Sequence, residues 1–138
     1  NPQETDRTLR SDGFVHTGDL GRFDDAGHLS VVGRCKELII RGGFNIYPPE
    51  VEAAINDHPT VIQSAVIGRS VAGNEEVLAF VQVPSKDATS EADLKEHLKD
   101  RLAPYKHPSR IVLTKSLPAA ATGKILKHKL VETFQDEL

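Results

Sequence analysis

The 138-residue sequence contains no methionine, no tryptophan and only one cysteine, Cys35. A single cysteine excludes an internal disulfide and indicates a reducing compartment, and we interpret this thiol as incidental. The lack of methionine is unusual for a complete translation product, so we expect a piece of a longer protein. No run reaches the roughly 18 apolar residues of a membrane-spanning helix, and the N-terminus lacks the apolar core of a secretory signal. These absences predict a cytoplasmic location without a membrane span.

A large excess of charge of either sign is also absent. The 17 basic and 20 acidic residues leave a formal net charge of -3, so no overall field favours nucleic acid or an anionic membrane. The six histidines show no paired metal-ligand spacing and have no cysteine cluster beside them, which predicts no metal site. Because the net charge is small, any anion site must be local.

Turn residues divide the first forty positions into short segments, which is typical of strands and turns. We expect a small β-hairpin in which strands at 28–32 and 36–40 pair. Pro48 then begins a helix that ends before His58, and Glu50 near its start complements the positive end of the helix dipole.

The remaining chain contains β-branched runs, a capping box and apolar stripes with helical spacing. These patterns predict strands at 61–67, 76–83 and 110–113, a helix from Ser90 to the residue before Pro104, and a final helix at 122–134. The whole pattern predicts an α+β fold, in which the hairpin precedes a compact mixed sheet of about three strands covered by helices.

The predicted last helix breaks a local rule, because basic residues occupy its positive end. Lys124, Lys127, His128 and Lys129 lie in the first turns, where each would be disfavoured by roughly 0.3–1 kcal/mol. A Gly-Lys pair at a helix N-terminus makes an anion site, since free amide N–H groups, the dipole and the ammonium converge. The segment is not a P-loop, because Pro118 occupies the required upstream glycine position. We therefore predict that Lys124 binds an anion.

The segment from Gly33 to Glu50 combines cations, paired glycines and a helix start. Glycine at Gly42 and Gly43 allows a left-handed backbone or the close approach of a ligand. The segment therefore has two interpretations that can coexist: a hairpin with a tight turn, loop and helix, or a ligand site.

Three separated motifs, at 12–21, 33–52 and 117–125, together resemble the C-terminal part of the adenylate-forming enzymes. This superfamily includes acyl- and aryl-CoA synthetases, luciferases and peptide-synthetase adenylation domains. The resemblance implies the fold of the small C-terminal lobe of these enzymes. The sequence of residues 37–48 resembles the CoA ligases more than the peptide synthetases, so coenzyme A is the preferred thiol acceptor.

The resemblance implies a two-step ligation. A carboxylate attacks the α-phosphorus of ATP to give an acyl-adenylate and pyrophosphate, and a thiol then displaces AMP. Asp19 matches the aspartate that holds the ribose hydroxyls, a role that suits an acceptor-only carboxylate. Arg34 matches an arginine that reaches the nucleotide, and Lys124 matches the lysine of the first half-reaction, whose ammonium would offset the repulsion between two anions.

The same resemblance assigns the second half-reaction to other residues. Lys36 matches the hinge about which the lobe rotates, and Gly42, Gly43 and Phe44 would then line the tunnel for the pantetheine arm of coenzyme A. Residues 105–108 are interpreted as a structural loop near the moving surface of the lobe.

Under this resemblance residues 1–35 are the end of a large N-terminal adenylation domain and the approach to the hinge, and residues 36–138 are the mobile lobe. The missing N-terminal domain is the expected partner, with a small carboxylic acid as substrate and Mg2+ bound with ATP mainly outside this piece. Alone, the piece is predicted to be inactive. Two alternatives remain: the corresponding lobe of a peptide-synthetase adenylation domain, and a non-catalytic α+β module that binds an anionic ligand or a protein.

Overall fold

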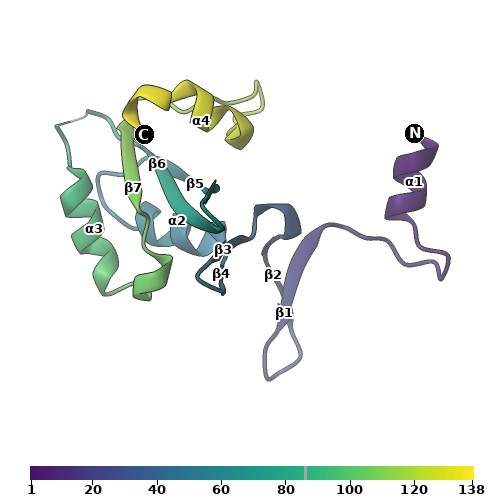
Figure 1. Cartoon of the computed structure of the whole chain (residues 1–138). Coiled ribbons are helices and arrows are strands. Elements are labelled where there is room, and N and C mark those ends of the chain that lie inside the picture. Colours follow the sequence, from purple (N-terminus) through teal and green to yellow (C-terminus); the bar gives the residue numbers. More distant parts are fainter. Residues whose placement is uncertain (86) are drawn as a thin grey trace. The chain divides into compact units, whose positions relative to one another are not determined.

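The computed structural model describes residues 1–85 and 87–138 and divides into two compact units, Asn1–Lys36 and Glu37–Leu138 (Figure 1). The first unit contains helix α1 (Pro2–Thr8) and an antiparallel hairpin of β1 (Asp19–Phe23) and β2 (Leu29–Arg34). Asp24 forms the hairpin turn, since its Oδ1 accepts the backbone N–H groups of Ala26 at 3.0 Å and His28 at 2.8 Å. Large apolar side chains of this unit, such as Phe14 and Phe23, are exposed.

The predicted pairing of 28–32 with 36–40 is wrong. Residues 29–34 pair with β1, residues Cys35–Glu37 form a 3-10 helix, and β3 (Ile39–Arg41) pairs with β4 (Phe44–Ile46). Each strand thus pairs across a turn with its own signal: Asp24 and Gly27 close the first hairpin, and Gly42 and Gly43 close the second.

The second unit is built on a three-stranded mixed sheet with the order β5-β6-β7. Its strands are β5 (Gln63–Val71), β6 (Asn74–Gln82) and β7 (Arg110–Thr114), with β6 antiparallel to β5 and parallel to β7. A two-residue turn, formed by Ala72 and Gly73 at positive φ, joins β5 to β6. The mixed α+β architecture predicted from the sequence is confirmed.

The sheet is covered on both faces. Helices α2 (Pro48–Asn56) and α3 (Glu91–Lys99) bury their apolar residues against one face, while Leu130 and Phe134 pack with Leu117 against the other. Alternate residues of β6 point to the two cores, as the period of a strand requires: Val77, Ala79 and Val81 to the first and Leu78 and Phe80 to the second. The predicted helices after Pro48 and Ser90 are therefore confirmed.

Helix α3 begins with the predicted capping box. The backbone N–H of Asp93 donates to Ser90 Oγ at 3.1 Å, and Asp93 Oδ2 accepts the backbone N–H of Ser90 at 3.0 Å. The Ser90 hydroxyl also donates to Asp93 Oδ2, at 2.7 Å. This hydrogen bond, followed by that from the Ser90 backbone N–H, holds the pKa of the Asp93 carboxyl below its ordinary value.

The predicted final helix at 122–134 is wrong over its first half. Residues Ala119 and Ile125 form an antiparallel bridge, Lys127–Lys129 form a 3-10 helix, and only α4 (Leu130–Thr133) is α-helical. Gly123 has a φ of +84°, which ends any continuous helix at this position. Backbone hydrogen bonds from Ala120 N–H to the Lys124 carbonyl and from Leu126 N–H to the Pro118 carbonyl close the loop instead.

A substitution at Gly123 distinguishes the loop from a helix by the sign of its effect. In a helix, Gly123→Ala would stabilise the protein by about 1 kcal/mol. At the observed positive φ it should instead lower the free energy of unfolding by about 1–2 kcal/mol. Gly123→Asn should cost less, because asparagine tolerates left-handed backbone. Urea denaturation of the unmodified protein and the two variants measures the free energy of unfolding. A gain in stability for the alanine variant would contradict the loop.

Candidate functional site

Lys124 lies on the exposed loop between Ala119 and Ile125. Two residues separate it from the 3-10 helix that begins at Lys127, so the predicted convergence with a helix N-terminus is wrong, because no helix begins at Gly123. Within residues 1–85 and 87–138, no carboxylate forms an ion pair with its ammonium. The lysine therefore presents a free positive charge on a closed loop, without the aid of a helix dipole.

Lys127, three residues later, has a different environment. Its Nζ lies 2.7 Å from Glu37 Oε2 and 2.8 Å from Glu52 Oε1, and its side chain is partly buried. Burial alone would lower the pKa of the ammonium, but the two carboxylates outweigh it and raise the pKa above its ordinary value. Lys124 and Lys127 are therefore not one basic patch.

Gly42 and Gly43 form the two-residue turn between β3 and β4. Their φ angles are +57° and +82°, the signs required at both positions of a type I′ hairpin turn. A Cβ at either position would meet no atom of the described chain within 4 Å. Backbone conformation therefore accounts for both glycines within this unit, and the space beside them is open.

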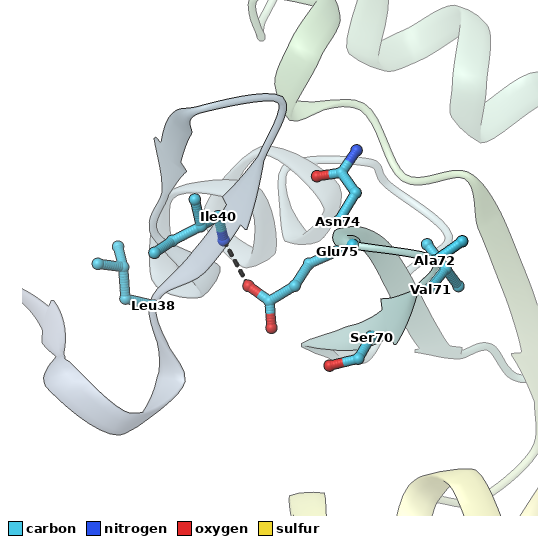
Figure 2. A pocket seen from close by; sticks show the side chains of 8 residues that line it. Leu38, Ile40, Ser70, Val71, Ala72, Asn74 and Glu75 are labelled. Atoms are coloured by element: carbon cyan, nitrogen blue, oxygen red, sulfur yellow. Dashed lines mark hydrogen bonds between the residues drawn. The ribbon is translucent and has the colours of Figure 1, made fainter.

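The β5–β6 turn fixes this hairpin on one side. Asn74 Oδ1 accepts the N–H of Gly42 at 2.8 Å, and Glu75 Oε2 accepts the N–H of Ile40 at 2.6 Å. Figure 2 shows the Glu75 side chain reaching from the start of β6 to β3 beside an open groove of about 620 Å³, whose walls include Leu38 and Val71.

The loop at 104–107 fixes the hairpin on its other side. The rings of Phe44 and Tyr105 stack with centroids 4.6 Å apart, and Arg41 Nη1 donates to the carbonyl oxygens of His107 at 2.7 Å and Tyr105 at 3.4 Å. Arg41 therefore fastens the hairpin and is not a free cation. Lys106 Nζ lies 2.5 Å from Glu50 Oε1, a hydrogen bond that raises the pKa of Lys106 despite its partial burial.

No sequence pattern assigned a function to Asn74, Glu75 or Tyr105. Each contacts the hairpin from a position about 30 to 60 residues away in the chain, and no local pattern marks such a partner. The only available signals were the turn residues around Asn74 and the aromatic ring of Tyr105.

In the first unit, the structure brings together two of the predicted nucleotide-binding residues. Asp19 and Arg34 are opposite each other in the β1–β2 register, and Arg34 Nε donates to Asp19 Oδ1 at 3.0 Å. Arg34 also donates through Nη2 to the carbonyl of Thr17 at 3.4 Å. Lys36, the predicted hinge, is exposed and is the last residue of this unit.

Two kinds of feature are not found in the described part of the chain. Residues 1–85 and 87–138 hold no group of three or more histidine, cysteine, aspartate or glutamate side chains that could bind a metal ion. Among the same residues no helix has the length and apolar character needed to cross a membrane.

Known proteins resemble the chain over nearly its whole length. The family model of the AMP-binding enzyme C-terminal domain matches residues 50–124. A mitochondrial medium-chain acyl-CoA ligase of Rattus norvegicus is 37% identical over 99% of the chain and 22% of its own length. A long-chain-fatty-acid–CoA ligase of Mycobacterium tuberculosis is 38% identical over 97% of the chain and 27% of its own length.

A solved structure gives the same result in three dimensions. The crystal structure of ATP-bound MatB from Rhodopseudomonas palustris is 40% identical and has a TM-score of 0.85, covering 98% of the chain and 27% of that protein. The chain thus spans about a quarter of the length of its relatives. These findings confirm the resemblance seen in the motifs, and the chain belongs to the AMP-binding enzyme C-terminal domain family, as found in acyl-CoA ligases.

Proposed function

We propose that the chain is the C-terminal part of an ATP-dependent carboxylic acid–CoA ligase and supplies its adenylation lysine, its hinge and its thioesterification loop. The observation that carries this proposal is the free, exposed ammonium of Lys124 on a closed loop, in a chain of this family. A solved relative from Bacillus subtilis, 34% identical with a TM-score of 0.84, holds an acyl-adenylate intermediate, which supports the same chemistry.

In the first half-reaction the substrate carboxylate attacks the α-phosphorus of ATP. Both groups are anionic, so a preorganised ammonium from Lys124 stabilises the charge that builds between them. Asp19 accepts hydrogen bonds from the ribose hydroxyls. Arg34 fixes the Asp19 carboxylate through the 3.0 Å hydrogen bond and directs its own guanidinium to the nucleotide.

In the second half-reaction the thiol of coenzyme A attacks the acyl carbon and AMP leaves. Before this step the lobe rotates about Lys36. The rotation removes the Lys124 loop from the active site and brings in the turn formed by Gly42 and Gly43, with Phe44 beside it. Two observations support this exchange. Figure 1 has the β3–β4 hairpin and the segment before α4 at different edges of the second unit, and the hairpin is fixed to its own unit from two sides. The loops would therefore move together as one rigid body.

Under this proposal residues 1–35 complete a larger N-terminal domain and residues 36–138 form the mobile lobe. That domain holds the small carboxylic acid, most of the ATP and the Mg2+ that accompanies it. The exposed apolar residues of the first unit, such as Phe14 and Val31, support a covering partner of this kind. We place the enzyme in the cytoplasm and in fatty acid metabolism.

The full-length protein separates the two half-reactions. Lys124→Ala should lower acyl-adenylate formation, followed as pyrophosphate release, by about 10²–10³-fold or more. Thioester formation from supplied acyl-adenylate should change far less, because the ammonium acts only in the first step. Lys129→Ala, a nearby exposed lysine, is the matched control and should affect neither step. Equal losses in both steps would contradict the assigned role.

A second substitution distinguishes the role of Gly42 in the hairpin turn from its proposed role in the tunnel for coenzyme A. Asparagine is favoured at the first position of a type I′ turn, so Gly42→Asn should leave the free energy of unfolding within about 0.5 kcal/mol. Its side chain would enter the open space beside the turn and slow thioester formation from acyl-adenylate by about tenfold, a loss of about 1.4 kcal/mol in transition-state stabilisation. Gly73→Asn, in the β5–β6 turn, is the control. An unchanged rate of thioester formation in the Gly42 variant would contradict the tunnel role and show that this glycine serves the turn alone.

A further inference from the structure

Lys127 is not used by the chemistry above, although it has two acidic partners from distant parts of the chain. Its Nζ contacts Glu37 beside the hinge residue and Glu52 on α2, at 2.7 and 2.8 Å. Glu52 Oε1 also accepts the backbone N–H of Val66 on β5 at 2.8 Å. One ammonium therefore connects the C-terminal segment to α2, to the sheet and to the residue after Lys36.

This ion-paired cluster lies directly beside the Lys124 loop. Leu126 donates its N–H to the Pro118 carbonyl at 2.8 Å and closes the base of the loop, and Lys127 is the next residue. On the incoming side Leu117 is buried in the second core, and on the outgoing side Ile125 packs against the same core. Lys127 is thus the charged anchor at the outgoing end of the loop.

The two carboxylates of this cluster depend on the ammonium between them. Two carboxylates meet one ammonium, and both acceptor oxygens lie within 2.8 Å of the same nitrogen, so they are close neighbours. Loss of the ammonium would leave Glu37 and Glu52 facing each other as like charges in a partly buried place. The outgoing end of the loop would then lose its attachment and its acidic partners would separate.

We propose that Lys127 is a positioning residue, whose ion pairs with Glu37 and Glu52 hold the Lys124 loop in the place required for adenylation. The proposal rests on the function proposed above for Lys124. Displacement of a catalytic group by about 1 Å can cost about 10²-fold in rate, so a loosened loop would be costly although Lys124 itself remains.

The test uses the full-length protein with three variants. Lys127→Met removes the charge and keeps the length, Lys127→Arg keeps the charge, and Lys129→Met removes a nearby charge that forms no ion pair among the described residues. We expect adenylation in Lys127→Met to fall by about 10- to 100-fold, with near-normal thioester formation from supplied acyl-adenylate. Arginine should restore adenylation, and Lys129→Met should have no effect.

Amide hydrogen exchange supplies a readout that does not depend on activity. In Lys127→Met the amides of Ala120 and Leu126 should exchange about tenfold faster, while that of Phe80 in the central strand should not change. Equal loss of both half-reactions, unchanged loop exchange, or the same effects in Lys129→Met would overturn the proposal. If the unmodified protein formed no acyl-adenylate, the proposed function would fail, and hydrogen exchange would still decide whether Lys127 anchors the loop.

Discussion

The burial of β6 on both faces is the constraint on which the second unit depends. Its side chains alternate between two cores, so the strand needs a cover on each side. Helices α2 and α3 cover one face, and the C-terminal segment covers the other through Leu130 and Phe134. The segment that carries Lys124 lies between Leu117 and Leu130, which are both buried in this cover, so its position follows from the packing of the sheet.

The candidate functional residues lie on turns at the margins of this core. Gly42 and Gly43 form one turn and Gly123 supports another, each with a positive φ that glycine adopts at little cost. Turns alone would be mobile, but contacts with distant segments tie each turn to the core. The first turn is held by Asn74 and by the hydrogen bond from Arg41 to His107, and the second by the ion pairs of Lys127 with Glu37 and Glu52. The structure thus combines exposed positions with a fixed backbone, the combination that the role proposed for Lys124 requires.

Local signals predicted most elements of the second unit. The prolines before Glu50 and the capping box at Ser90 mark helices because they act on the first turn itself, and the β-branched runs mark three strands. The predictions failed where distant contacts compete with local preference. Leu126 and Leu130 have helical spacing, but Gly123 and the hydrogen bond from Leu126 to Pro118 favour a closed loop. Strand partners in the first forty residues were misassigned because apolar runs do not specify which turn closes.

By itself, the sequence determined the α+β class, the family and the types of residue available for the chemistry. Periodicity, turn residues and motifs can be recognised because each is contained in a short stretch of the chain. Only the tertiary structure decided which cations are free. Lys124 and Lys127 are three residues apart and similar in sequence, but one is exposed and the other is neutralised by Glu37 and Glu52. The physical reason is that the partners of a charge come from distant segments, and only folding brings them within hydrogen-bond distance.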